Sequence, residues 1–257
     1  MRRAVLPALL VLAGVPARAT AQPAPEPRAL SVAAAANLRP AMAELAKAFE
    51  RANPGVRVEV TLGASGALFA QIRNGGPFDL FFSADRDFPR RIVEAKLGGP
   101  EVVYAIGRLV LWTPPGSPLS LERMGVAGLA ARGVERIAIA NPAAAPYGRA
   151  AVAAMQAAGV AQAVQGRLVL GESVAQAAQL AQTGAADVAL IPASLAAEPA
   201  LAGGKALLVP QSLHPRLEQS AAVLSRARDP RLARAFLDLV TGSAGRDILA
   251  RYRYELP

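Results

Sequence analysis

One short pattern occurs twice in this chain at a fixed distance, and this repeat limits the folds that the chain can adopt. The copies run from residue 63 to 80 and from residue 171 to 188. Gly63, Ser65, Gln71, Gly76 and Asp79 recur as Gly171, Ser173, Gln179, Gly184 and Asp187, with the same offset throughout (171 − 63 = 187 − 79 = 108). Each copy predicts a strand, a Gly-x-Ser turn, a helix ending at glycine, an aspartate and a second strand. The alternative is coincidence, because any such unit needs a turn glycine and a stop glycine. We favour two similar lobes over this alternative.

The two serines of this repeat lie where helices are expected to begin. A serine at that place can cap a helix, and the first turn of a helix leaves backbone N–H groups without partners. These N–H groups and the helix dipole together attract anions. If the two lobes face each other, the two helix starts at Ser65 and Ser173 could approach one anion across a cleft.

The beginning of the chain predicts export from the cytoplasm. Residues 1–21 have a basic start, an apolar run from Ala4 to Val15 that is too short to span a bilayer, and cleavage motifs that end at Ala19 or Ala21. We interpret residues 1–21 as a signal peptide and the proline-rich residues 22–28 as a disordered leader. The chain has no cysteine, so it has neither a lipid-anchored cysteine nor a disulfide. We therefore expect a soluble protein of the bacterial periplasm.

The charge of the chain gives only weak evidence about its partners. The formal net charge is +9, and removal of the three arginines of residues 1–21 leaves 25 basic and 19 acidic residues (28 − 3 = 25; 25 − 19 = +6). The basic residues are scattered and aromatic residues are few, whereas a nucleic-acid surface needs a basic stripe with aromatic side chains. We expect no nucleic-acid partner; the positive surface fits long-range attraction of an anion.

Predicted strands and helices alternate along the rest of the chain, which indicates an α/β fold with mainly parallel sheets. The clearest strands are Leu30–Ala33, Val56–Leu62, Leu80–Phe82, Leu109–Trp112, Ile137–Ala140 and Val188–Ile191. In such sheets, ligands bind beyond the carboxyl ends of the strands. The turns at that edge are predicted at residues 33–38, 63–66, 140–148 and 171–174.

These turns carry hydrogen-bond donors but no catalytic set. They contain Asn37, Ser65, Ser173 and Tyr147, which suit the binding of a fully deprotonated oxyanion better than chemistry on it. The single histidine, His214, is expected in a surface loop, so neither a zinc site nor a Ser/His/Asp triad is predicted.

A pair of acidic residues could in principle act as general acid and base. Asp79 and Asp85 lie six positions apart, on either side of the predicted strand at residues 80–82. We favour structural roles for both of them, because an aspartate beside a strand more often binds loop N–H groups.

Several motifs together resemble the periplasmic molybdate-binding proteins of ABC transporters. The motifs, which cover nearly all of the mature chain in order, are Ala33-Ala-Ala-Ala-Asn37-Leu38, Gly63-Ala-Ser65-Gly66, Asp79-Leu-Phe-Phe-Ser83-Ala84-Asp85, Asn141-Pro142 with Pro146-Tyr147-Gly148, and Tyr252-Arg-Tyr254. The resemblance implies the type 2 periplasmic binding protein fold, with two α/β lobes, two hinge crossings and a ligand cleft between the lobes. It places lobe 1 at residues 29–107 and 223–257 and lobe 2 at residues 108–222.

The resemblance also implies a set of ligand-binding residues. By position, Asn37 and Ser65 correspond to the ligands of the first lobe, and Tyr147 and Val174 to those of the second, Val174 through its backbone N–H. The chain departs from some family members at Pro192, where they have a tyrosine that reaches the anion. Proline has neither an N–H nor a hydroxyl, so we expect the hydroxyl of Tyr147 to take that role.

The implied function is capture of molybdate, and of tungstate, for delivery to an ABC permease in the inner membrane. The resemblance implies a monomer without a cofactor or a bound metal cation, because molybdenum enters as the oxyanion. Sulfate or another tetrahedral oxyanion is an alternative ligand, and an enzyme on the same fold is a less favoured alternative.

Overall fold

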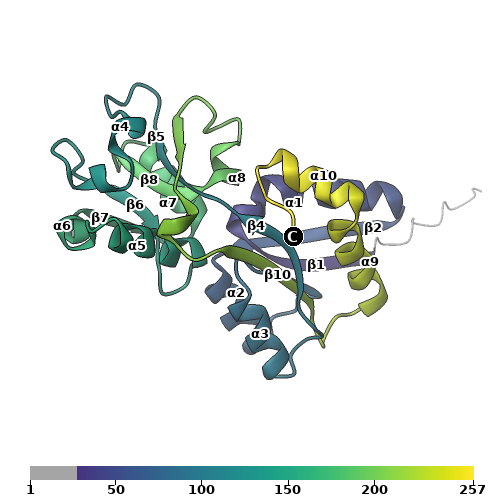
Figure 1. Cartoon of the computed structure of the whole chain (residues 1–257). Coiled ribbons are helices and arrows are strands. Elements are labelled where there is room, and N and C mark those ends of the chain that lie inside the picture. The colour runs from purple at the N-terminus through teal and green to yellow at the C-terminus, as the bar shows by residue number, and fades with distance from the viewer. Residues whose placement is uncertain (1–27) are drawn as a thin grey trace, which may run out of the picture.

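The computed structural model describes residues 28–257, which form two lobes that each contain a five-stranded sheet (Figure 1). The expected signal peptide, and the expected leader apart from Arg28, lie outside the described residues. Among the helices of residues 28–257, none combines the length and the apolar character that a bilayer crossing demands. The expected α/β class is confirmed.

The first lobe is built on a sheet with the strand order β2-β1-β3-β10-β4. Its strands are β1 (Arg28–Ala35), β2 (Val56–Gly63), β3 (Leu80–Phe82), β4 (Val102–Gly107) and β10 (Leu217–Val223). Strand β1 is parallel to β2 and β3, and β10 is antiparallel to β3 and β4. The helices of this lobe are η1 (Ala36–Leu38), α1 (Arg39–Ala52), α2 (Ser65–Arg73), α3 (Asp87–Glu94), α9 (Pro230–Thr241) and α10 (Ser243–Arg251).

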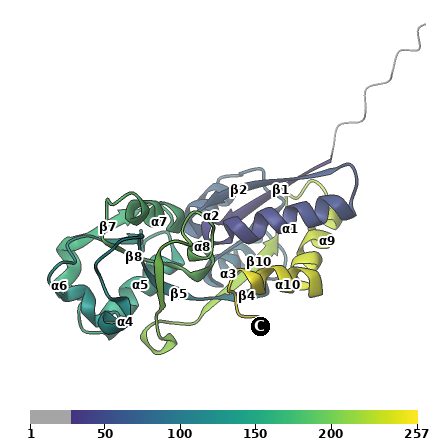
Figure 2. The ribbon, with the colours of Figure 1, turned by 90° about the horizontal axis from the view of Figure 1, so that it is seen from above.

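Two hydrophobic clusters cover the two faces of the first sheet. Helices α1, α9 and α10 pack on one face, where the rings of Phe49 and Phe82 both meet Phe236 edge to face, with centroids 5.1 and 5.9 Å apart. Helices α2 and α3 pack on the other face through residues that include Phe69 and Phe88. Figure 2 shows the second view of this layered arrangement. Because the sheet is covered on both sides, its central strand β3 is apolar throughout.

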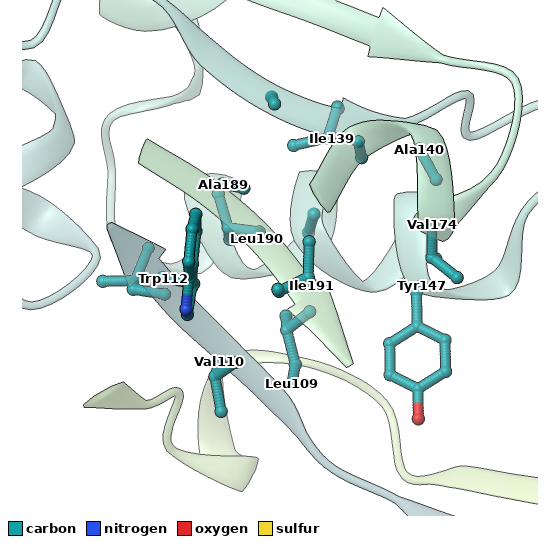
Figure 3. Packing of buried hydrophobic residues seen from close by; sticks show 14 of the residues in the cluster. Leu109, Val110, Trp112, Ile139, Ala140, Tyr147, Val174, Ala189, Leu190 and Ile191 are labelled. Carbon is teal, nitrogen blue, oxygen red and sulfur yellow. The ribbon is translucent and has the colours of Figure 1, made fainter. Parts of the chain in front are cut away.

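The second lobe repeats this plan with the strand order β7-β6-β8-β5-β9. Its strands are β5 (Leu109–Thr113), β6 (Ile137–Ala140), β7 (Leu168–Gly171), β8 (Val188–Pro192) and β9 (Lys205–Leu208). Its helices are α4 (Leu121–Met124), η2 (Ala127–Ala130), α5 (Pro146–Ala157), α6 (Ala161–Val164), η3 (Gln165–Arg167), α7 (Val174–Gln182), α8 (Ala193–Ala196) and η4 (Gln211–Leu213). Apolar side chains of β5, β6 and β8 form the core around Trp112, as Figure 3 shows.

The predicted repeat appears in the topology of the two lobes. The first copy forms β2, α2 and β3, and the second forms β7, α7 and β8, with the same parallel strand between each pair: β1 in the first sheet and β6 in the second. Asp79 and Asp187 also keep one role, because each carboxylate accepts N–H groups, Asp79 from Ser31 at 2.7 Å and Asp187 from Arg136 at 2.8 Å. The lobes are therefore alike in the order of their strands as well as in the repeated motif.

The chain crosses between the two lobes twice, and these two crossings form the hinge. Strand β4 ends at Gly107 in the first sheet, and β5 begins at Leu109 in the second. The return crossing lies before residue 217, because β10 pairs with β3 and β4 of the first sheet. Residues 217–222, which we expected in lobe 2, thus belong to the first sheet. Nothing in their own sequence marks the sheet with which they pair, so only the pairing decides.

Candidate oxyanion site

The four expected ligand residues surround one small pocket between the lobes. Asn37 and Ser65 come from the first lobe, and Tyr147 and Val174 come from the second. The pocket is small in this closed arrangement, with a cavity volume of about 10 Å³. Its lining consists of Ala35, Ala36, Asn37, Gly63, Ala64, Ser65, Ala84, Ala145, Pro146, Tyr147 and Val174.

Helix starts from both lobes meet at this pocket. Ser65 is the first residue of α2, Tyr147 is the second residue of α5, and Val174 is the first residue of α7. The first turns of these helices hold N–H groups without partners inside the helix, and their dipoles place positive potential there. No lining residue is ionisable at neutral pH, so the pocket offers neutral donors to an anion.

Ser65 and Ser173 have different roles, although the repeat relates them. Ser173 is the N-cap of α7, and its side chain accepts the N–H of Gln176 at 3.3 Å, as the sequence predicts. The N-cap of α2 is Ala64, and Ser65 makes no capping hydrogen bond. The buried hydroxyl oxygen of Ser65 instead accepts the N–H of Ala84 at 3.0 Å. Its hydroxyl proton is thus available to a ligand, and Ser65 does not take the capping role that a serine at a helix start can have.

The side chain of Tyr147 extends from the pocket toward the hinge. Its hydroxyl oxygen accepts an N–H from the side chain of Gln219 at 3.0 Å, and a Cβ at Gly107 would overlap that hydroxyl. Figure 3 shows Val174 near the backbone end of the ring, with the hydroxyl at the far end. Burial raises the pKa of the Tyr147 phenol well above its usual range, so the phenol stays protonated. Tyr147 thus offers a backbone N–H at the start of α5 and a protonated hydroxyl at the far end of its ring.

Pro192 lies outside the pocket. It ends β8, where it pairs with Leu109 of β5, and it is buried in the sheet of the second lobe. The hydroxyl oxygen of Tyr147 accepts from Gln219, and its expected role as the donor that Pro192 lacks stays a prediction.

A buried network of polar side chains lies between the pocket and the hinge. Its centre is Gln219 of β10, at a bulge in the pairing with β4. The network joins Gln219 to Asn37, Tyr104 and Tyr147, and it joins the Asn37 side chain to Tyr254. Ser194 donates to the backbone oxygen of Asn37. Sequence reasoning missed Gln219, because a lone glutamine in an unremarkable strand carries no pattern. Tyr254 belongs to the C-terminal motif of the resemblance but was given no role.

Contacts across the cleft hold the two lobes together. The N–H of Gly66 donates to the backbone oxygen of Ala144 at 2.9 Å. At one rim Arg39 makes a two-pronged ion pair with Glu198, at 2.9 and 2.5 Å. These contacts join lobes that a hinge connects, so the structure is a closed form.

The other rim of the cleft carries a second ion pair. Arg149 of α5 lies 2.5 Å from the carboxylate of Asp85, which follows β3 of the first lobe. Burial raises the pKa of Asp85, against the lowering effect of hydrogen bonds from Ser83 and Phe88. The carboxylates of Asp79 and Asp85 thus bind different partners, and the structural roles favoured for them are confirmed.

The remaining candidates for catalysis or metal binding are dispersed. His214 is buried rather than on the surface, with its ring Nδ1 2.8 Å from the backbone oxygen of Pro215, so the expected surface position was wrong. Within residues 28–257, no group of three or more histidine, aspartate or glutamate side chains is placed to hold a metal ion.

The chain matches the sequence model of one family, the bacterial extracellular solute-binding proteins, over residues 30–255. It is 34% identical to the molybdate-binding protein ModA of Azotobacter vinelandii over 230 residues, which cover 88% of this chain and 90% of that protein. ModA of Rhodobacter capsulatus is also 34% identical, with 86% of each protein covered.

Solved structures show the same fold. The periplasmic molybdate-binding protein of Azotobacter vinelandii aligns with a TM-score of 0.82 at 31% identity, over 89% of this chain and 99% of that one. The sulfate-binding protein SubI of Mycobacterium tuberculosis has a TM-score of 0.76 at 17% identity, over 89% and 87% of the two chains, which shows a common fold alone. The expected two-lobed periplasmic binding protein fold is confirmed.

Proposed function

This chain belongs to the bacterial extracellular solute-binding proteins, and we propose that it captures molybdate outside the cytoplasm and delivers it to an ABC permease of the inner membrane. Tungstate, which has the same charge and shape, is the second ligand of the proposal. The protein would act in the periplasm as a monomer, after removal of residues 1–21. We assign it no catalytic step and no cofactor.

The observation that carries this proposal is the meeting of α2, α5 and α7 at one pocket that has no charged lining residue. An anion there would receive backbone N–H groups from both lobes and the hydroxyl of Ser65. A net hydrogen bond to a charged group contributes about 1.5–3 kcal/mol. Six of them would contribute about 9–18 kcal/mol, compared with roughly 12 kcal/mol for nanomolar binding, and the excess at the upper end offsets dehydration of the anion and closure of the lobes.

The chemistry of the lining separates molybdate from phosphate. Near neutral pH, phosphate keeps a proton that a carboxylate would accept best, and the lining contains no carboxylate. Sulfate carries no proton, so it remains the alternative ligand, and the size of the closed pocket must discriminate against it. The fold shared with a sulfate-binding protein keeps this alternative open but does not favour it.

Transport follows from the closed arrangement of the lobes. Binding of the anion to donors of both lobes stabilises the closed form relative to an open one, because only the closed form offers all of them. The permease would then recognise the closed protein. Two ion pairs, Arg39 with Glu198 at one rim of the cleft and Arg149 with Asp85 at the other, hold the lobes in that form.

Calorimetry of the mature protein with molybdate, tungstate, sulfate and phosphate tests the proposal. We expect tight binding of molybdate and tungstate and weak binding of sulfate and phosphate. Sulfate or phosphate affinity equal to that of molybdate would overturn it.

A further inference from the structure

A chain of three buried side chains connects the pocket to the hinge. Asn37 Nδ2 donates to Gln219 Oε1 at 2.9 Å, and Gln219 Nε2 donates to the hydroxyl oxygen of Tyr147 at 3.0 Å. The hydroxyl of Tyr104 also donates to Gln219 Oε1, at 2.9 Å. Gln219 thus touches one pocket residue from each lobe, although it does not line the pocket itself.

In this arrangement the amide of Asn37 offers nothing that an anion can use. Asn37 Nδ2 donates to Gln219 and also to the hydroxyl of Tyr254, at 2.8 Å, so both of its protons are taken. Asn37 Oδ1 is buried and has no hydrogen-bond partner within residues 28–257. A buried acceptor without a donor is costly, and an anion without a proton cannot supply one.

Turning both amides over removes this conflict. Gln219 Nε2 then donates to Asn37 Oδ1 and to the oxygen of Tyr104, while the Tyr147 hydroxyl donates to Gln219 Oε1. The Tyr254 hydroxyl donates to Asn37 Oδ1, and Asn37 Nδ2 becomes free. If only one amide turned, two oxygens or two NH₂ groups would face each other between Asn37 and Gln219, so the two amides must turn together.

We propose that Gln219 is a positioning and specificity residue, which lets Asn37 present its NH₂ group to a fully deprotonated oxyanion by turning over with it. This inference rests on the proposed function. The reversed arrangement gives every side chain of the network a partner and adds a donor to the pocket. The arrangement with Asn37 Oδ1 unpaired would favour an oxyanion that carries a proton. The hinge residue thereby selects for the absence of a ligand proton.

Two substitutions at residue 219 separate this role from a structural one. In Gln219→Glu the carboxylate only accepts, so it keeps Asn37 Nδ2 in the network and blocks the reversal. In Gln219→Met the side chain neither donates nor accepts, and Asn37 can turn freely, with Oδ1 accepting from Tyr254. Ser220→Ala is the matched control, because Ser220 is equally buried on the same strand but bonds to Asp85 and Glu101 instead.

Calorimetry with sodium molybdate gives the dissociation constant of each variant between about pH 6 and about pH 8. An exposed glutamate is ionised throughout this range, whereas a buried one, such as that of Gln219→Glu, titrates within it. The affinities are expressed as ratios to the unmodified protein at each pH. The phenols of Tyr104, Tyr147 and Tyr254 stay protonated in this range, because burial raises the pKa of each. Asp85, Glu101, Glu218 and Arg86 lie near the strand and are unchanged in every variant, so each ratio compares proteins with the same neighbouring charges. Thermal melts without ligand report folding.

We expect Gln219→Met to weaken binding by about ten-fold or less, and Gln219→Glu by about 100-fold at the upper pH, as for loss of one hydrogen bond to a charge. The loss in Gln219→Glu should shrink as the pH falls and its carboxyl becomes protonated. When Asn37→Ala is added to both variants, the ratio between the molybdate affinities of Gln219→Met and Gln219→Glu should fall by about ten-fold. Ser220→Ala should bind like the unmodified protein.

Three results would overturn the inference while the proposed function stands. The first is an equal loss of molybdate affinity in Gln219→Glu and Gln219→Met at every pH. The second is a difference in affinity between these two variants that persists in full with Asn37→Ala, which would report direct charge repulsion. The third is a loss of affinity in Ser220→Ala as large as that in Gln219→Glu. If the unmodified protein fails to bind molybdate, both the inference and the proposed function are overturned.

Discussion

Ser65→Ala should weaken oxyanion binding and also destabilise the ligand-free protein. The substitution removes a hydroxyl whose proton is free for the anion, which costs about 1.5–3 kcal/mol, or roughly 10- to 150-fold in the dissociation constant. It also removes the acceptor of the Ala84 N–H, 3.0 Å away in a buried environment. A buried N–H without a partner costs about 1–3 kcal/mol of unfolding free energy. Both losses should occur in one variant because one oxygen makes both hydrogen bonds.

The repeat provides a matched control for this substitution. Ser173 lies 108 residues later at the start of α7, where it caps the helix by accepting the N–H of Gln176. Ser173→Ala should lower the unfolding free energy by about 0.5–2 kcal/mol, the usual cost of losing a cap. Because Ser173 does not line the pocket, its removal should leave the affinity within about three-fold of the original, a shift well below one hydrogen bond.

Two measurements on each variant decide between the roles. Calorimetry with molybdate gives the dissociation constant, and urea unfolding without ligand gives the free energy of unfolding. The reasoning fails if Ser65→Ala destabilises the protein but binds molybdate as tightly as before. It fails equally if Ser173→Ala loses as much affinity as Ser65→Ala, since the two serines would then act alike.

Three further predictions concern the hinge and the charges around the cleft. Tyr147→Phe should weaken binding by about ten-fold and lower stability, since Gln219 loses a buried partner; unchanged calorimetry and urea unfolding would exclude this role. Gly107→Ala should lower the unfolding free energy by about 1–3 kcal/mol in urea unfolding, because its Cβ would overlap the Tyr147 hydroxyl; an unchanged midpoint would contradict the crowding. Raising the chloride concentration should slow association in stopped-flow experiments while dissociation stays nearly constant, because the pocket lining is uncharged and Arg39 pairs with Glu198. A steep rise in the dissociation rate would instead place a cation at the ligand.

The lobes and the pocket could be predicted from the sequence because their determinants are local. A strand, a glycine turn and a helix start are set by neighbouring residues, and the 108-residue repeat shows that the chain forms this unit twice. Parallel strands then bring their turns to one edge, so Asn37 and Ser65 had to meet on the first lobe, and Tyr147 and Val174 on the second. Local sequence does not determine which sheet β10 joins, because the residues of a strand do not encode its pairing partners. We therefore expected most of β10 in the wrong lobe.

The directions of the hydrogen bonds at the site could not be predicted in this way, because they depend on contacts between residues that are far apart in the sequence. Asn37 and Gln219 are 182 residues apart, and Asn37 and Tyr254 are 217 apart, yet these contacts decide which atom of Asn37 the pocket receives. A motif specifies that an asparagine is present, but only the closed assembly of β1, β10 and the C-terminal segment fixes the direction of its amide. The same holds for Tyr147, whose ring begins at the pocket and whose hydroxyl reaches the hinge. In our proposal, a pocket with a neutral lining therefore depends, for its choice of anion, on Gln219 of β10, the strand that follows the return crossing.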